Sequence, residues 1–431
     1  MSEIIRVKVR RGKHHRHSSH HKRAKSLASS SKKFQTRFPR IYRVFTNTLN
    51  FFKKHRFFGL LTILNLAGLL LNAIFFLFED FAADYTATFG HFLRLCLGTL
   101  SSFFPFSLGE FLVLSFLAFM LIWVFVLYFA LKRKYTLRRI HHKMRNTLLA
   151  PLAAALIVLS LFLFTFSSAY HTPPLAQKLG LNESDIYDRD LYNTVEYLVQ
   201  EINTTLSKIE TDDAGSTVMP YNFNNLSSEI NLSFQDLNDE EQICPATGSP
   251  AKSFVTSPIL TKFSLAGVYT FFSGEANINT AYPDFCLPYY TAHELAHQRG
   301  IASENDANFT AFLVCAASTD PYIRYSGHLN ALMVLKTELA QFLAIHEAQD
   351  PDYTTEIRDN VNNILAKLDD RVNAELRAYH AFYNEHKNDS LTKLSSDLND
   401  TYLKTQGQTA GEDSYQYLTA LIVNYYTTYL A

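Results

Sequence analysis

Hydrophobic positions are distributed unevenly along this chain. Its first part holds three uncharged apolar runs, at residues 57–78, 111–131 and 148–166. Each run has about 19–22 residues, which as a helix spans roughly 30 Å, the thickness of the apolar core of a bilayer. Buried helices of a soluble protein are the alternative, but three such runs without a charge disfavour it. The pattern therefore predicts a membrane domain of about three transmembrane helices at residues 57–169.

Residues 170–431 show the mixed pattern of a globular domain. Residues 253–290 alternate apolar and polar side chains, as a strand does, whereas residues 213–250 read as loop with short helical pieces. Helical spacing recurs in four segments, at residues 182–212, 329–348, 355–386 and 415–429. The pattern predicts a mainly helical, α+β domain with a small sheet.

Charge divides the chain at the same place. The 431 residues include 40 basic and 40 acidic side chains, so the formal net charge is zero. Residues 1–170 carry 25 Lys and Arg against 5 Asp and Glu, and residues 171–431 carry 15 against 35. The neutral total disfavours a partner such as nucleic acid, and the opposite signs of the two parts indicate two environments.

The positions of the basic residues predict the orientation in the membrane. Residues 1–56 contain 17 Lys and Arg and residues 132–146 contain seven, whereas Arg94 is the only one in residues 79–110. Cytoplasmic loops are enriched in these residues. We therefore expect a multi-pass protein surrounded by membrane lipid, with residues 1–56 as a disordered cytosolic tail. Residues 170–431 then form an extracytoplasmic domain, and residues 91–104 read as an interfacial or re-entrant segment.

Two cysteines of the outer part allow two interpretations. A disulfide between Cys244 and Cys286 suits an extracytoplasmic compartment. Thiols packed singly as small hydrophobic groups suit the sequence equally well.

The chemical signal lies at residues 291–309, which read TAHELAHQRGIASENDANF. His293 and His297 are four residues apart on a helical stretch, so their imidazoles project from one face and can share a zinc ion. Glu294 lies beside the first histidine, where it can take a proton from water that zinc activates. The segment predicts a zinc site with Glu294 as the general base. A structural helix is the alternative.

The third zinc ligand requires a turn in the chain. On one continuous helix Glu304 would lie about 10 Å beyond His297, too far to bind the same ion. Gly300 is suited to end the first helix, and Ser303 to cap a second one with Asp306 three residues later. Glu304 then lies in the first turn of the second helix and completes a site of two histidines and one carboxylate.

Supporting residues are less sharply indicated. Asp306 can orient one of the histidines, although capping alone also explains it. Hydrolysis of an amide needs a donor for the oxyanion, and Tyr325, His328, Arg324 and Tyr402 are candidates. A purely structural role is the alternative for each of them. Glu275 and Asn277 suit a strand that pairs with an extended peptide, with a turn or a plain edge strand as the alternative.

Several segments together resemble a known family. The HELAHQRGIASENDANF block, FSGEANIN before it and PYIRYSG after it are similar to the bacterial membrane proteins grouped as domain of unknown function 3810. PFSLGE, NDTYLKTQGQ and SYQYL match this family too, so the resemblance covers the chain from the first apolar run onward. It implies transmembrane helices followed by a zincin-like region with metallopeptidase activity. The ENDANF segment is also similar to the E-x-E-A-N-x-F stretch of a zinc peptidase group, in which the first Glu binds the metal. Asp306 takes the place of the second Glu here.

These observations predict a membrane-anchored zinc hydrolase. The expected reaction is cleavage of peptide or other amide bonds outside the cytosol, with a peptide or protein as substrate and a cell-wall peptide as one candidate. A non-catalytic membrane-bound binding or sensor module that keeps a structural metal is the alternative.

Overall fold

The computed structural model describes residues 37–132, 137–181, 186–213, 215–240, 242–405 and 417–430. Its contacts divide the chain into two units, Met1–Leu64 and Asn65–Ala431. Up to residue 36, the tail that was predicted to be disordered lies outside the described residues. The last part of this tail is instead helical: Pro39–Lys54 form α2, which has proline at its start and Lys53 and Lys54 in its last turn.

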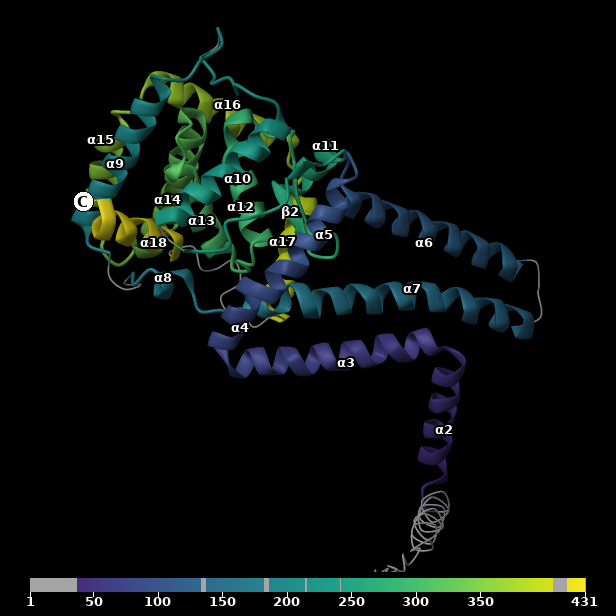
Figure 1. The fold of residues 1–431 in the computed structure, drawn as a ribbon. Coiled ribbons are helices and arrows are strands. Elements are labelled where there is room, and N and C mark those ends of the chain that lie inside the picture. The colour runs from purple at the N-terminus through teal and green to yellow at the C-terminus, as the bar shows by residue number, and fades with distance from the viewer. Residues whose placement is uncertain are drawn as a thin grey trace, which may run out of the picture. The chain divides into compact units, whose positions relative to one another are not determined.

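Two of the three predicted apolar runs are long enough to cross a membrane. They form α3 (Arg56–Leu77) and the first part of α6 (Leu108–Lys132). The third run lies in α7 (Leu137–Thr165), in which Leu149–Thr165 is a shorter apolar helix. α6 and α7 leave the helical body of the second unit on the same side (Figure 1).

The segment predicted to be interfacial or re-entrant is built into the second unit. α4 (Glu79–Tyr85) continues through the π-helical turn η1 (Thr86–Gly90) into α5 (His91–Ser102). α5 packs against β3 and α7. Arg94 of α5 is fully buried, and its guanidinium donates to backbone carbonyls that compensate its charge.

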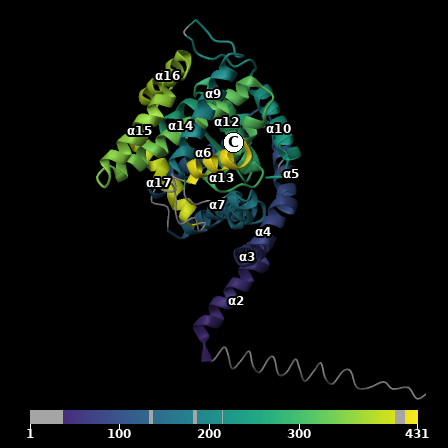
Figure 2. The same ribbon diagram turned by 90° about the vertical axis from the view of Figure 1, so that its left-hand side faces the viewer.

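Most of the second unit is helical, as predicted for residues 170–431. α12 packs against α13, α10 and α14, and α9 packs on α14 (Figures 1 and 2). The helices of this part are α8 (Leu175–Lys178), α9 (Asp188–Leu206), α10 (Phe223–Glu240), α11 (Ser257–Leu260), α12 (Leu287–Gln298), α13 (Glu304–Ala317), α14 (Pro321–His346), α15 (Pro351–Leu365), α16 (Asp370–His386), α17 (Asp389–Thr405) and α18 (Tyr417–Tyr425).

A three-stranded sheet confirms the strand prediction for residues 253–290. Its order is β1 (Lys252–Ser253), β3 (Glu275–Ile278), β2 (Gly267–Thr270). β2 runs antiparallel to β3, with Val268 opposite Asn277, and β1 runs parallel to β3. The expectation that Glu275 and Asn277 meet an extended peptide is wrong, because both lie buried in the central strand. β1 and β2 are the strands at the two edges of the sheet.

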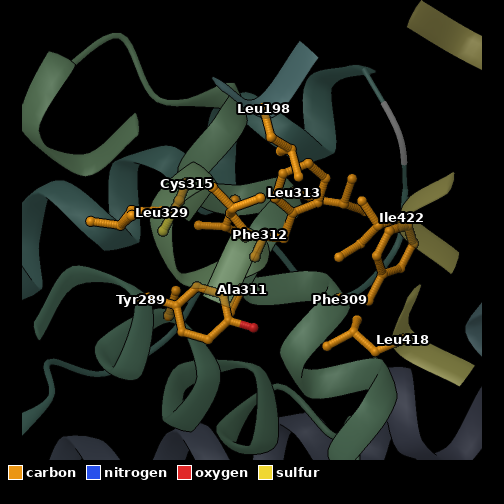
Figure 3. Close-up of a cluster of buried hydrophobic side chains, with 14 of the residues drawn as sticks. Leu198, Tyr289, Phe309, Ala311, Phe312, Leu313, Cys315, Leu329, Leu418 and Ile422 are labelled. Atoms are coloured by element: carbon orange, nitrogen blue, oxygen red, sulfur yellow. The ribbon is translucent and has the colours of Figure 1, made fainter. Parts of the chain in front are cut away.

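The core of the second unit is built around α13. Phe309, Phe312 and Leu313 of this helix are buried together (Figure 3). Side chains of the neighbouring helices close over them, among them Leu198 of α9, Tyr289 of α12, Leu329 of α14, and Leu418 and Ile422 of α18. Burial of a side chain of this size contributes roughly 1.5–3 kcal/mol. This core holds the helix that begins at Glu304.

Several predicted boundaries differ in the structure. The polar helix predicted at residues 355–386 is divided into α15 and α16, because Asp369 caps a new helix by accepting from the Arg371 amide. α10 occupies a segment predicted to be mostly loop. The four cysteines are free, so Cys244 and Cys286 are not joined.

Candidate metal centre

The two histidines of α12 meet on one side of the helix, as their spacing predicts. The Nε2 atoms of His293 and His297 are 3.1 Å apart. The Nδ1 atom of His297 lies 2.7 Å from the carbonyl oxygen of Ile301. Because a carbonyl can only accept, Nδ1 carries a proton, and when the ring is neutral its Nε2 atom presents the lone pair that a metal ligand requires.

The turn after α12 brings Glu304 back to the histidines. Gly300 has a φ of +98°, a conformation that favours glycine. Ser303 then caps α13, and its side chain accepts from the backbone amide of Asp306. Glu304 is the first residue of α13, and its Oε2 atom lies 3.3 Å from His293 Nε2 and 3.7 Å from His297 Nε2.

The three donor atoms have the spacing of zinc ligands. The donor atoms of His293, His297 and Glu304 all lie within 4.8 Å of one another. Ligands at about 2.0–2.1 Å from a tetrahedral zinc ion are about 3.3 Å apart. The observed separations of 3.1, 3.3 and 3.7 Å scatter around this value. These residues therefore fit one ion with a fourth position free.

His297 and Glu304 each shift the pKa of the other toward its charged form. Burial alone would lower the pKa of His297, but the neighbouring Glu304 carboxylate raises it to about 9. Burial would likewise raise the pKa of Glu304, yet the charge of His297 and hydrogen bonds from both histidines lower it well below its ordinary value. The cluster thus holds a proton that a cation can replace.

Glu294 lines the same cavity as the cluster, and one of its carboxylate oxygens has no hydrogen-bond partner among the described residues. The residue is buried, and this oxygen is Oε2. Burial raises the pKa of Glu294, while the two histidines and the backbone amide of Tyr269 act in the opposite direction. A carboxylate with a raised pKa accepts a proton more readily near neutral pH.

Gly267 makes room for this carboxylate. A Cβ atom at Gly267 would lie 2.5 Å from Cγ and 2.6 Å from Oε1 of Glu294. Real Cβ atoms do not approach other atoms so closely, so a side chain at this position of β2 would have to displace Glu294.

A cavity of about 540 Å³ opens onto the metal ligands. Tyr290 and Asn308 line it beside Glu304, and Gly267, Val268 and Tyr269 of β2 form one side. Segments distant in the sequence complete it, namely Phe166 and Tyr170 after α7 and Thr392, Ser395 and Ser396 of α17. No local pattern in the sequence marks these five residues, because only the tertiary fold brings them to the site.

The other predicted site residues lie elsewhere. The Oδ2 atom of Asp306 accepts from the amide of Leu175. Tyr325 donates to Glu375, and His328 packs between Phe312 and Tyr197. Neither Tyr325 nor His328 lines the cavity. The side chain of Tyr402 lies outside the described part of the chain.

The model of one protein family, described as "Protein of unknown function (DUF3810)", matches residues 85–423. This range includes α5, α6, α7 and the whole metal centre, but begins after the first apolar run. No curated protein and no solved structure matches the chain.

Proposed function

Because the chain belongs to the family of proteins of unknown function DUF3810, whose description names no activity, we propose a function from the metal centre. The proposed activity is that of a zinc-dependent hydrolase, a metallopeptidase that cleaves peptide or other amide bonds. The supporting observation is the convergence of His293, His297 and Glu304 at the spacing of zinc ligands. It lies beside an unpartnered Glu294 oxygen, in a cavity large enough for a peptide side chain.

Each residue has a distinct task in this proposal. The Nε2 atoms of His293 and His297 and the Oε2 atom of Glu304 hold the ion. A zinc ion held there would supply the Lewis-acid chemistry that makes water nucleophilic near neutral pH. Glu294 takes the proton of the attacking water on Oε2 and passes it to the leaving amine. The buried position of Glu294 keeps bulk water from competing for that proton.

The membrane arrangement is a proposal too. α3, α6 and the apolar part of α7 would cross the bilayer three times, with the basic N-terminus in the cytosol. Residues 170–431 and the metal centre then face the outside of the cell membrane. A zincin-like domain in that compartment meets secreted, membrane and cell-wall peptides.

The test combines metal content with turnover. The purified full-length protein is expected to hold about one zinc ion per chain and to cleave a mixed peptide library. Glu294→Gln should keep the metal but lower cleavage at least a thousandfold, whereas Glu385→Gln, on the exposed side of α16, should change neither. Metal binding without cleavage by the wild type favours the alternative, a structural metal in a binding or sensor module. Absence of bound metal contradicts the zinc proposal.

A further inference from the structure

One wall of the metal cavity is formed where an apolar helix ends. α7 ends at Thr165, and Phe166 and Tyr170, the residues that follow, line the cavity. The ring of Phe166 packs on Tyr269 with centroids 5.2 Å apart, and that of Phe162 packs on Phe271 at 5.3 Å. The last turn of this apolar helix is therefore in direct contact with the segment around β2 that borders the metal ligands.

The first turn of α6 is attached to the same sheet. The amides of Leu108 and Gly109 donate to the two carboxylate oxygens of Glu275 in β3, at 3.0 and 2.7 Å. Lys252 of β1 forms an ion pair with this carboxylate at 2.7 Å. Gly109 also approaches the end of β2, since a Cβ atom there would lie 2.8 Å from Thr270 Cγ2. α7 thus ends at the cavity, and α6 begins at the same small sheet, beside Glu275 and Thr270.

Large apolar side chains are exposed around this point. Phe103 before α6 is 80% exposed. Val255, just before α11, is 77% exposed, and Ile259, within α11, is 56% exposed. The amide of Val255 donates to Glu110 of α6, which places this apolar loop beside the first turn of α6. Exposure of such an apolar cluster to water is unfavourable, whereas aromatic and aliphatic groups at the end of a membrane helix suit the bilayer interface.

We propose that the cavity receives peptide segments that an apolar anchor, a transmembrane helix or an acyl chain, holds at the membrane surface. The inference rests on the proposed hydrolase activity and adds its substrate class. Phe166 directly follows α7 and lines the cavity, so an interface at this end of α7 borders the cavity itself. An anchored substrate then needs only a short extended segment, about five residues or roughly 16 Å of chain, to enter it. The cleaved bond therefore lies close to the anchor of the substrate.

The first experiment varies the tether of the substrate. Full-length protein with zinc is placed in vesicles of phosphatidylcholine and phosphatidylglycerol and given three mixed peptide libraries of equal composition. One is free, one carries a palmitoyl chain through a spacer of about five residues, and one carries it through about 30 residues. Both acylated libraries are concentrated at the vesicle surface, so a difference between them reports the effect of spacer length and not of local substrate concentration. Cleavage of the short-spacer library should be at least tenfold faster than that of the other two.

Equal rates for the three libraries, or for both spacers, overturn the inference while leaving the hydrolase proposal intact. Val255→Asp combined with Ile259→Asp should reduce the advantage of the short spacer severalfold. Ile345→Asp on α14, which is 63% exposed, is the matched control and should leave it unchanged.

A second measurement does not depend on turnover. In a Trp123→Phe background, a tryptophan introduced by Val255→Trp should be quenched by lipids brominated near the headgroup, and one introduced by Ile345→Trp should not. Absence of quenching at position 255 overturns the inference whatever the libraries show. If no library is cleaved above the Glu294→Gln level, the hydrolase proposal fails, and with it the substrate class. Quenching then still decides whether the cavity borders the membrane.

Discussion

The guanidinium of Arg94 donates to the backbone carbonyl of Gln298 at 2.9 Å, at the end of the helix that carries the two histidines. It also donates to the carbonyls of Arg299 at 3.1 Å, Thr165 at 2.7 Å and Thr86 at 2.8 Å. Carbonyls at a helix C-terminus carry partial negative charge, which compensates a buried cation. One side chain from the segment before α6 therefore caps both α12, which carries the two histidines, and the apolar helix α7.

We expect Arg94→Gln to destabilise the second unit by about 3–5 kcal/mol, because carbonyls at the ends of α12 and α7 lose a buried partner. Unfolding of the detergent-solubilised protein in urea measures the change. Arg358→Gln removes an exposed guanidinium that lies 3.4 Å from Glu347, and should cost less than about 0.5 kcal/mol. Similar unfolding midpoints for the two variants would contradict the capping role of Arg94.

Gly267→Ala should impair turnover without removing the metal. The three atoms nearest to the added Cβ atom all belong to Glu294, at 2.5–2.8 Å. Displacement of the carboxylate should lower kcat at least tenfold with an unchanged zinc content, as measured by peptide cleavage and elemental analysis. Gly59→Ala provides the control, because a Cβ atom there makes only ordinary contacts of 3.7 Å or more with Phe52. Full activity of Gly267→Ala would show that Glu294 is free to move.

The convergence of His293, His297 and Glu304 could be predicted because their placement is local. His293 and His297 are one helical turn apart, Gly300 ends the helix, and Ser303 starts the next one. All of these signals lie within twelve residues, and each acts through backbone geometry that the residue type largely determines. The resulting separations follow with little help from the rest of the fold.

The remaining parts of the cavity depend on contacts between distant segments. Phe166 lies more than a hundred residues before the histidines and enters the site through its packing on Tyr269. Arg94 reads as a loop cation in the sequence, since the carbonyls that accept from it come from three separate places in the chain. Asp369 looked like any surface residue of a polar helix, because capping and exposure leave the same local pattern. Such features follow from tertiary packing, which periodicity does not contain.

Loss of the carboxylate ligand should weaken metal binding more than loss of its neighbour in the first turn of α13. Glu304→Gln keeps the size of the side chain but removes the charge that faces both histidines. We expect zinc affinity to fall at least a hundredfold, as measured by competition with a chelating dye. Asp306→Asn, which alters a group that contacts the Leu175 amide, should change affinity less than about threefold. Equal effects would assign metal binding to the whole turn instead of Glu304.

Zinc affinity should increase with pH up to the pKa of His297. In the metal-free protein the Glu304 carboxylate raises the pKa of His297 to about 9, so this ring is protonated at pH 7. A zinc ligand must be neutral imidazole, and binding therefore releases one proton. The lowered pKa of Glu304 keeps that carboxylate ionised, so it contributes no proton of its own.

The dissociation constant should fall about tenfold for each pH unit between pH 6.5 and 8.5 and level off near pH 9. Chelator competition in buffers of constant ionic strength measures this slope. In Glu304→Gln the pKa of His297 loses its main support, so the slope should flatten above pH 7. A wild-type affinity that is constant over this range would show that His297 binds no proton in competition with the metal.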